Sequence, residues 1–287
     1  MSFRWKIFLA SVAIMVFIIG VTVGTSLFFI HRGIRETIVS DLAVMSQIAE
    51  KLISSEINLL KAKAWTAVHR LENKDRSQWP EILKQAVESE DIFLSITVSD
   101  REHFLASYGE PPTPQDLIKS SYAMKAFEGQ TVISTSREAP GGDLVFHICV
   151  PFDKDTIASV TIPGLYFSRI LGQYRIWDTG SVYILDDEGK VLANERTFMV
   201  LGEYNPVQDL RDDINVNSFR EFTREMIRGG RGSGRYILDD IERLAYFTSI
   251  TGSNVGWTLG ISAPLSESPL TYVDQAVVLM TLVFMAL

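Results

Sequence analysis

The sequence contains a single cysteine, Cys149, and only four histidines in 287 residues. One cysteine excludes an internal disulfide, a CxxC redox pair and a zinc site built from thiolates. The histidines, at positions 31, 69, 103 and 147, show no HExxH pattern and no other short metal-ligand spacing. We therefore expect no metal and no other cofactor. Cys149 lies in a strand-like stretch and is expected to be a buried structural residue.

Basic residues are also too few for some functions. The chain has 27 Lys and Arg against 35 Asp and Glu, a formal net charge of −8 and a pI near 5.1. Binding of nucleic acid requires a basic face, so nucleic acid is not an expected partner. The sequence has no G-x-S-x-G nucleophile elbow and no other catalytic constellation. We expect that this chain is not itself an enzyme.

Two motifs suggest ligand chemistry but lack the parts that such sites need. Gly229–Arg235 is rich in glycine, yet it ends in Arg-Tyr where a P-loop requires Gly-Lys-Ser/Thr. It also follows a predicted helix, so a flexible helix-to-strand turn is expected. Asp186–Gly189 is acidic but lacks the remaining ligands of a twelve-residue calcium loop, and it is expected to be a solvated hairpin turn.

A long apolar run, Ile7–Ile30, is present near the N-terminus and carries no charge. It is long enough to cross a hydrocarbon core as a helix. A cleaved signal peptide is the alternative, but its apolar region would be shorter, and Phe28–Arg32 is a poor cleavage site. Residues 1–31 are therefore expected to form a cytoplasmic stub and a transmembrane helix.

The C-terminal end of the chain becomes apolar again. In Leu270–Leu287 the apolar residues follow Asp274 and continue to the last residue. Residues 268–287 are expected to begin a second transmembrane helix, incomplete in this chain. Large loops cross a membrane regardless of flanking charge, so the polar loop between the two spans is expected outside the cytoplasm.

Residues 32–90 are expected to form a long stalk helix followed by a short helix. Apolar residues recur at steps of four and three, first at Ile38, Leu42, Met45, Ala49 and Leu52 and then, one residue out of step, from Ile53 to Leu71. A helix of about 40 residues is about 60 Å long. Two interpretations remain open. The helix backs a sheet, or its first half also pairs with a second copy of the chain.

The loop repeats one order of elements twice. Residues 91–165 predict a hairpin, a helix that ends at Gly129, and three strands. Residues 166–267 predict a hairpin around Ser181–Ala193, a helix that starts with the capping box Ser218 and Glu221, and three strands. Each unit predicts an antiparallel sheet with helices packed on it, so the fold class is α+β.

Two stretches resemble parts of a known family. Asp178–Ala193 resembles the opening hairpin of a membrane-proximal Cache module, and Gly256–Leu265 resembles its closing strand. With the order of elements, the loop from Arg32 to Glu267 resembles the double Cache family of bacterial extracytoplasmic sensor domains. The resemblance implies two tandem PAS-like modules, the distal one at 91–165 and the proximal one at 166–267. It also implies that the chain lies in the inner membrane of a bacterium. The whole receptor would then be a chemoreceptor, a sensor histidine kinase or a diguanylate cyclase, with its signalling module after the second span.

The resemblance further implies that a ligand binds in the membrane-distal module. Members that bind amino acids carry an Arg-x-Trp-Tyr signature and an aspartate in the last strand. This chain has Lys119-Ser-Ser-Tyr122 and Thr161 near these places, so an amino-acid ligand is not expected. The pocket is expected between the segment 111–129 and the sheet. Its polar candidates are Lys119, Ser121, Tyr122, Ser134, Ser136, Arg137, His147 and Thr161, of which Lys119 and Arg137 suit a carboxylate.

The sequence therefore predicts an extracytoplasmic sensor that binds a small molecule, with a carboxylate as one candidate, and passes a signal through the membrane. The alternative is an ectodomain that binds no small molecule and instead dimerises or binds a partner protein, such as a periplasmic binding protein. A homodimer is expected from the seam Ile38–Leu52. A membrane-tethered enzyme is a third hypothesis, which the absence of a catalytic motif disfavours.

Overall fold

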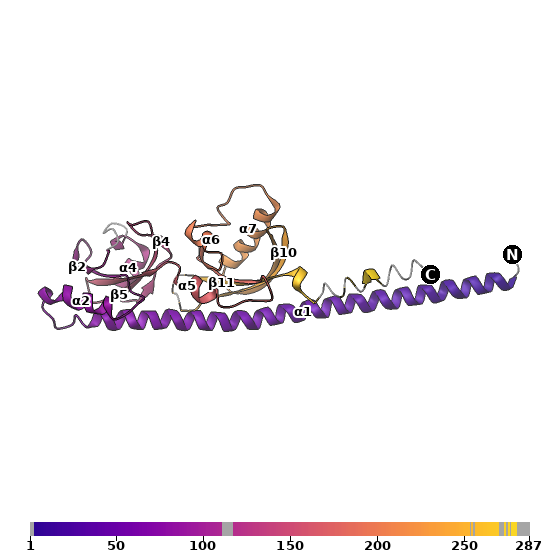
Figure 1. Cartoon of the computed structure of the whole chain (residues 1–287), viewed down its shortest axis with the longest axis horizontal. Coiled ribbons are helices and arrows are strands. Elements are labelled where there is room, and N and C mark those ends of the chain that lie inside the picture. The colour runs from indigo at the N-terminus through magenta and orange to yellow at the C-terminus, as the bar shows by residue number, and fades with distance from the viewer. Residues whose placement is uncertain are drawn as a thin grey trace.

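A computed structural model describes residues 3–110, 117–252, 254, 256–269, 273, 275 and 277–279. One long helix, α1 (Phe3–His69), runs beneath two antiparallel sheets and continues beyond them toward the N-terminus (Figure 1). The α+β fold predicted from the sequence is confirmed. The expected second transmembrane helix, residues 268–287, falls largely outside the described residues.

Helix α1 joins the predicted apolar span and the predicted stalk into one element of 67 residues. Where it passes the sheets, its buried side chains repeat at steps of three and four: Ile38, Leu42, Ser46, Ala49, Ile53, Ile57, Leu60, Ala64 and Ala67. Ile38, Leu42 and Ala49 of the expected dimer seam are thus buried within the chain's own core, whereas Met45 is 42% exposed. The interpretation of a long helix that backs a sheet is confirmed.

The first unit contains a six-stranded sheet. Its elements, in chain order, are η1 (Arg76–Gln78), α2 (Trp79–Glu88), β1 (Ser95–Ser99), β2 (Phe104–Tyr108), α4 (Ser121–Phe127), β3 (Val132–Ile133), β4 (Arg137–Glu138), β5 (Leu144–Pro151) and β6 (Ile157–Pro163). The strands lie in the order β2-β1-β6-β5-β3, and β4 pairs with β5.

The second unit contains a five-stranded sheet. Its elements are α5 (Tyr166–Leu171), β7 (Ser181–Leu185), β8 (Val191–Asn194), α6 (Thr197–Leu201), α7 (Ile214–Ile227), β9 (Arg231–Leu238), β10 (Ile241–Ser249), β11 (Thr258–Pro264) and η2 (Leu265–Glu267). The strand order is β8-β7-β11-β10-β9, which repeats the order of the first sheet. The internal repeat predicted from the sequence is therefore present.

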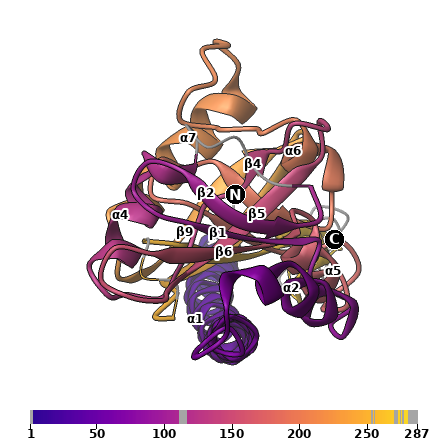
Figure 2. The same cartoon turned by 90° about the vertical axis from the view of Figure 1, so that its left-hand side faces the viewer.

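The helices divide between the two faces of the sheets. Helices α1 and α2 lie on one side, and α4, α6 and α7 lie on the other (Figure 2). Strand alternation explains this division. In β5, Phe146, Ile148 and Val150 join the core with α1, whereas Cys149 joins a small cluster with α4.

The capping box predicted for the second unit is wrong. Helix α7 begins at Ile214, and Asp213 caps it, because the Asp213 carboxylate accepts hydrogen bonds from the backbone N–H groups of Asn215 (2.7 Å) and Val216 (3.4 Å). Ser218 lies inside the helix, and its Oγ accepts a hydrogen bond of 2.9 Å from the N–H of Ile237 in β9. The Ser218 hydroxyl therefore joins helix to sheet and does not cap the helix.

The glycine-rich stretch is mostly strand, which corrects the expected flexible turn. Strand β9 begins at Arg231, and only Gly229 and Gly230 adopt turn conformations with φ of +83° and +90°. A Cβ atom at Gly232 would lie 2.8 Å from the ring of Phe247, and one at Gly234 would lie 2.8 Å from the ring of Phe222. Glycine is needed here because aromatic rings lie directly against the strand.

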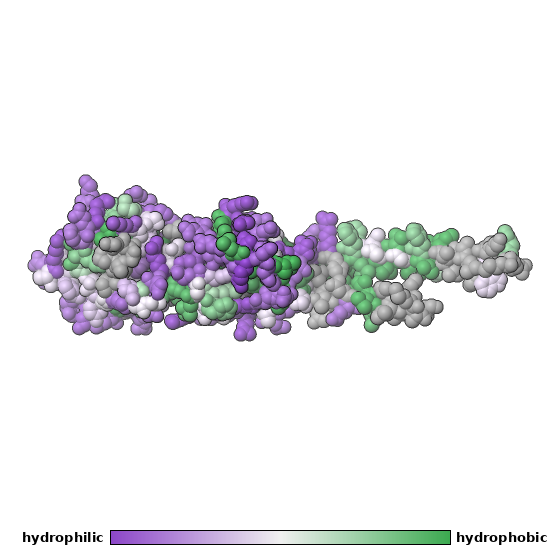
Figure 3. Space-filling view, turned by 90° about the horizontal axis from the view of Figure 1, so that it is seen from above, coloured by the Kyte–Doolittle hydropathy of each residue, from purple (hydrophilic) through white to green (hydrophobic). Residues whose placement is uncertain are grey.

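At its N-terminal end, α1 presents apolar side chains outward (Figure 3), among them Phe17, Phe28 and Phe29, which are 63–71% exposed. Within the described residues, one helix, α1, is long and apolar enough to cross a membrane, judged by length and composition. None of its most apolar 18-residue window is buried. This part of α1 contributes nothing to the folded core.

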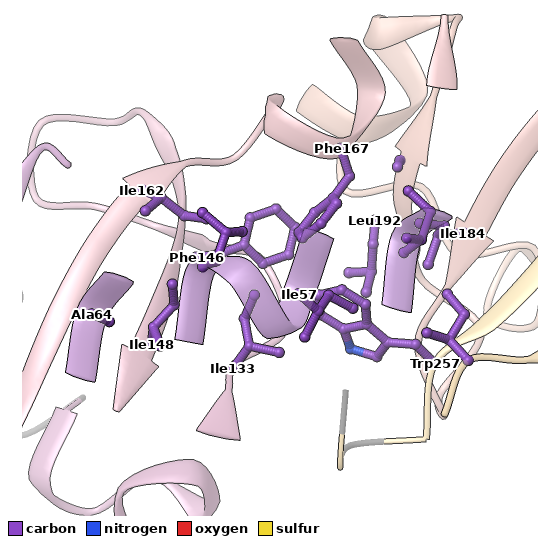
Figure 4. Packing of buried hydrophobic residues seen from close by; sticks show 14 of the residues in the cluster. Ile57, Ala64, Ile133, Phe146, Ile148, Ile162, Phe167, Ile184, Leu192 and Trp257 are labelled. Atoms are coloured by element: carbon purple, nitrogen blue, oxygen red, sulfur yellow. The ribbon is translucent and has the colours of Figure 1, made fainter. Parts of the chain in front are cut away.

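The two sheets share one core on the α1 side. Trp257, which immediately precedes β11, is fully buried, and its ring lies 5.6 Å from that of Phe146 in β5 and 5.5 Å from that of Phe167 in α5. Figure 4 shows these rings together beside Ile57 of α1. Side chains from both units and from α1 thus hold the two sheets in a fixed relation.

Candidate functional site

A cleft of about 750 Å³ opens beside α4, on the face of the first sheet that points away from α1. One wall comes from α4, the β4–β5 hairpin and strands β5 and β6. The opposite wall comes from the second unit, from the β7–β8 hairpin and the segment after α6. The cleft therefore lies between the two units of the repeat.

The floor of the cleft carries small polar side chains, because strand alternation turns the large apolar residues toward α1. His147 of β5 pairs in register with Thr161 of β6, and Thr161 pairs in turn with Ser95 of β1. Side chains that are opposite one another in register share a face of the sheet. Hydroxyl and imidazole groups thus occupy positions at which the α1 side has isoleucine, valine and phenylalanine.

His147 is only 4% exposed. Its Nδ1 lies 3.3 Å from Thr161 Oγ1 and 3.4 Å from Ser159 Oγ, and its ring stacks on Tyr122 at a centroid distance of 6.0 Å. Burial, followed by the charge of nearby Arg137, lowers the pKa of His147 to about 4. The imidazole is therefore neutral near pH 7, and the inner wall of the cleft is aromatic and uncharged.

Two basic side chains lie at the rim. The Arg137 guanidinium lies over the Tyr122 ring, 5.3 Å from its centroid, which is a cation–π contact. The Lys190 ammonium donates hydrogen bonds of 2.7 Å to the carbonyl oxygen of Ser136 and to Glu203 Oε1. Lys190 belongs to the second unit and Ser136 to the first, so this lysine connects the two walls.

The β7–β8 hairpin is shaped by Asp186. This carboxylate is buried and accepts hydrogen bonds from the N–H groups of Glu188 (3.1 Å) and Lys190 (2.8 Å). Burial is the main cause that raises the pKa of Asp186. Asp187 and Glu188 at the tip remain exposed and line the cleft. The stretch forms the expected hairpin turn, but it is also part of the wall.

Six of the eight residues predicted as ligand-binding line this cleft: Ser121, Tyr122, Ser136, Arg137, His147 and Thr161. Ser134 does not line it as described. Its buried Oγ accepts a hydrogen bond of 2.9 Å from the N–H of His147 and donates one of 2.7 Å to the carbonyl of Thr135. Ser134 therefore supports the backbone beneath His147. A role in ligand binding stays a prediction for each of the eight.

Lys119 is exposed in a turn and is outside the described lining of the cleft. The helix expected over this region is interrupted there. Residues 111–116 lie outside the described residues, and α4 begins only at Ser121, because Ser120 acts as its N-cap and accepts a hydrogen bond of 3.1 Å from the N–H of Ala123. The cap places Tyr122 in the first turn, where its ring meets His147.

Some residues of this face were missed from the sequence. The hydroxyls of Ser95, Thr97 and Ser99 in β1 are buried and have no hydrogen-bond partner in the described part of the chain, and the same is true of Ser136 Oγ. Buried polar groups without partners are rare in proteins, and a bound water or ligand is one explanation for them. The sequence feature that could have identified the three β1 residues is their alternation with Ile96 and Val98, which predicts one polar and one apolar face of the strand.

A smaller cleft of about 560 Å³ lies in the second unit between α6, the start of α7 and the end of β9. The rest of this face of the second sheet is closed. Aromatic rings of Tyr183, Phe219, Phe222 and Tyr236 fill it, with centroid distances of 6.1 Å between Tyr183 and Phe219 and 4.8 Å between Phe219 and Tyr236. A Cβ atom at Gly260 would lie 2.4 Å from the Tyr183 ring, so this ring packs directly on the sheet. Among the described residues, no group of three His, Cys, Asp or Glu could hold a metal ion.

Comparisons with known proteins bear on the fold. No family model and no curated protein sequence matches this chain. The ligand-binding domain of the Pseudomonas fluorescens chemoreceptor CtaA, in complex with L-isoleucine, is similar with a TM-score of 0.61 and 17% identity, over 82% of this chain and 96% of that one. The ligand-binding domain of the Pseudomonas aeruginosa PAO1 amino acid chemoreceptor PctB, in complex with L-Arg, also gives 0.61 and 17%, over 81% and 97%.

The extracellular domain of mmHK1S-Z2, described as a histidine kinase, gives a TM-score of 0.61 and 13% identity, over 82% of this chain and 98% of that domain. At such identities the likeness establishes the fold alone. The chain has the double Cache-like architecture of extracellular ligand-binding domains, with two antiparallel sheets along a long N-terminal helix. The resemblance stated from the sequence is confirmed at this level.

Proposed function

We propose that this chain is an extracytoplasmic sensor domain that binds a small molecule in the cleft beside α4. The observation that carries the proposal is the contrast between the two units. The first sheet has an open, polar cleft of about 750 Å³ whose described lining includes the unpartnered hydroxyl of Ser136, whereas aromatic rings fill most of the matching face of the second sheet and leave a smaller cleft of about 560 Å³. A cleft of this size suits a metabolite-sized ligand.

The solved structures support a binding function but do not supply the ligand. CtaA and PctB have this fold and were solved with L-isoleucine and L-Arg. By the resemblance drawn from the sequence, Lys119 and Thr161 stand near the places at which the amino-acid binders have an arginine and an aspartate, and Lys119 is outside the described lining of the cleft. The ligand is therefore to be identified from the cleft itself. The chain acts as a binding module, and catalysis has no part in the proposal.

The membrane part of the proposal rests on α1. Its exposed apolar stretch anchors the chain, and the sheets lie outside the cytoplasm. The same helix continues without a break past both sheets, so it is a mechanical path from the cleft to the membrane. A shift of an ångström or two along such a helix is a known output of receptors, and the ligand drives it by binding one position more tightly than the other.

The turn between β10 and β11 is hydrogen-bonded to both α4 and α1 and provides a route for this shift. Lys125 of α4 donates a hydrogen bond of 3.3 Å to the carbonyl of Asn254, in the turn between β10 and β11. The same turn is held to α1, because Lys61 donates a hydrogen bond of 2.7 Å to the carbonyl of Gly252 and Glu50 accepts one of 3.2 Å from the N–H of Thr251. A displacement of α4 would therefore reach α1 through one short turn.

The test is a thermal-shift screen of the 287-residue chain in detergent against carboxylates, amines, sugars and nucleobases. A ligand at about 100 times its dissociation constant adds about 2.7 kcal/mol of stability. For a domain of this size that raises the melting temperature by roughly 5–10 °C. A hit in any class supports the sensor, and no stabilisation by any compound contradicts it.

A dimerising ectodomain is the second candidate function. The face of α1 that points away from the sheets carries exposed apolar side chains, with Val44 at 54%, Ile48 at 62% and Leu59 at 49%. Light scattering of the purified chain tests this candidate. Ile48→Glu should convert a dimer to a monomer, whereas Leu210→Glu, at a loop residue that is 91% exposed, should not. A dimer that binds no compound of the panel would favour a spacer or a binder of partner proteins.

A further inference from the structure

The charge of the cleft indicates the class of its ligand. We propose that the cleft binds an organic cation, an amine, held between the first sheet and the β7–β8 hairpin of the second. This inference rests on the proposed sensor function and deepens it, because it assigns the ligand chemistry and makes the second unit part of the binding site.

The lining of the cleft is strongly acidic. Six carboxylates face it, against two basic side chains, Arg137 and Lys190, which gives a formal charge of −4. The carboxylates are Glu110, Glu138, Asp186, Asp187, Glu188 and Glu203. An anionic ligand would have to leave water and approach this excess of negative charge, whereas a cation gains from it.

The basic groups do not cancel this charge where a ligand would enter. The Lys190 ammonium forms an ion pair with Glu203, at 2.7 Å from its Oε1, so its charge is balanced by that carboxylate. Asp186 is committed to the backbone of its own hairpin. The exposed carboxylates of Asp187 and Glu188 at the hairpin tip, and Glu110 on the opposite wall, therefore dominate the mouth. The His147 imidazole, whose pKa burial lowers to about 4, adds no positive charge at pH 7.

Ser136 gives a second and independent indication of a ligand. Its side chain is fully buried and lines the cleft, and its Oγ has no hydrogen-bond partner in the described part of the chain. Its carbonyl oxygen accepts from Lys190, so only the hydroxyl remains to be satisfied. A hydroxyl left in this state destabilises the protein unless a bound molecule pairs with it. An ammonium or amine N–H directed at Oγ would do so.

The aromatic wall fits the same class of ligand. Tyr122 and His147 stack with an interplanar angle of 14° and present an uncharged aromatic surface. The Arg137 guanidinium lies over the Tyr122 ring, so this ring attracts a cation, and an amine would have to bind beside that guanidinium or displace it. An amine that is bound between Tyr122 and the hairpin tip would meet an aromatic face on one side and carboxylates on the other. This differs from the carboxylate ligand that Lys119 and Arg137 suggested from the sequence.

The experiment compares ligands that share one carbon skeleton. Putrescine, butane-1,4-diol and succinate each have four carbons and are doubly positive, neutral and doubly negative near pH 7. Together with the larger amines spermidine and tyramine, they are titrated into the 287-residue chain in detergent, with calorimetry and melting temperature as readouts. At least one amine should bind, and the diol and succinate should bind at least about tenfold more weakly.

Paired variants locate the bound charge. The double variant Asp187→Asn, Glu188→Gln should weaken amine binding by about tenfold, since it removes two carboxylates from the mouth. The control Glu221→Gln, Glu225→Gln removes the same charge from the exposed face of α7 and should leave the affinity unchanged. Melting curves of both ligand-free variants confirm that they are folded.

The outcomes separate this inference from the proposed function. If no amine binds while a carboxylate, sugar or nucleobase of the larger panel does, the cation assignment is overturned and the sensor stands. If an amine binds equally well to the double variant and its control, the hairpin is not part of the site and the inference fails. If nothing in the whole panel binds, the proposed function fails with it.

Discussion

The Nζ atom of Lys190 donates a hydrogen bond of 2.7 Å to the carbonyl oxygen of Ser136. Lys190 belongs to the hairpin of the second sheet, and Ser136 belongs to the rim of the cleft on the first sheet. The same ammonium contacts Glu203. Because the cleft is bounded by both units, this link sets its width, and a ligand that enters must either preserve the link or replace it.

Lys190→Ala should lower the free energy of unfolding by about 1 kcal/mol, because it removes a hydrogen bond to a carbonyl and a partly exposed ion pair. That corresponds to a fall of roughly 2–4 °C in melting temperature. The control is Arg235→Ala. It removes a hydrogen-bonded ion pair with Glu242 in which both side chains are nearly half exposed, and it should change stability by less than about 0.5 kcal/mol. Equal effects would show that Lys190 is an ordinary surface residue.

Trp257→Ala should destabilise the chain by about 3–5 kcal/mol, the usual loss for a large aromatic residue removed from a core. Trp257 is fully buried and touches Phe146 and Phe167 at the junction of the two units. Trp65→Ala is the matched control. Trp65 is 49% exposed and stacks on His69, so about 1 kcal/mol or less is expected. Urea unfolding measures both, and a small loss at Trp257 would contradict the shared core.

Acid should destabilise the fold through His147. Its pKa is about 4 in the folded chain, against about 6.5 for an unperturbed histidine. Between these values the unfolded chain binds more protons than the folded chain, so the free energy of unfolding falls as the pH falls from 6.5 to 4. The contribution reaches about 3 kcal/mol, and it is absent above pH 6.5.

Urea unfolding across this pH range tests that expectation. His147→Gln should lose this part of the pH dependence, whereas the control His103→Gln, at an exposed turn residue, should keep the slope of the parent chain. If the parent chain and His147→Gln show the same slope, the buried neutral imidazole is refuted. The comparison uses slopes, so a uniform loss of stability in the variant does not affect it.

Asp213→Ala should cost about 1 kcal/mol, since it removes the N-cap of α7. Glu221, the second residue of the capping-box motif, is exposed in mid-helix, and Glu221→Ala should cost less than about 0.5 kcal/mol. Thermal unfolding of the two variants distinguishes the cap found in the structure from the cap that the sequence suggested. A larger loss of stability for Glu221→Ala than for Asp213→Ala would support the capping box instead.

The fold was largely predictable because its signals are local. The apolar steps of α1, the turns and the repeated order of hairpin, helix and three strands are all visible in the sequence. Tyr122, Arg137 and His147 could be named as candidates because the pocket was expected between the segment 111–129 and the sheet. The capping box failed because Asp213 offers an earlier cap one turn before Ser218. The strand at Gly232 was missed because its glycines make room for aromatic rings from other elements, Phe247 of β10 at Gly232 and Phe222 of α7 at Gly234.

The second wall of the cleft could not be predicted. Asp187, Glu188 and Lys190 lie in the second repeat, and nothing local indicates that their hairpin meets the β4–β5 hairpin of the first. That meeting depends on how the two sheets are positioned along α1, and the packing of Trp257 on Phe146 contributes to that position. A contact of this kind becomes visible only when the whole fold is known.

The most direct test of the account is the affinity of the strongest compound of the thermal-shift screen for Tyr122→Ala. Tyr122 is buried at the base of the cleft and stacks on His147, whereas Tyr174 is 44% exposed and does not line it, so Tyr174→Ala is the control. Calorimetry should show at least about a tenfold loss of affinity for Tyr122→Ala and none for the control, with both variants folded. Unchanged binding to a folded Tyr122→Ala would place the ligand elsewhere and contradict the account.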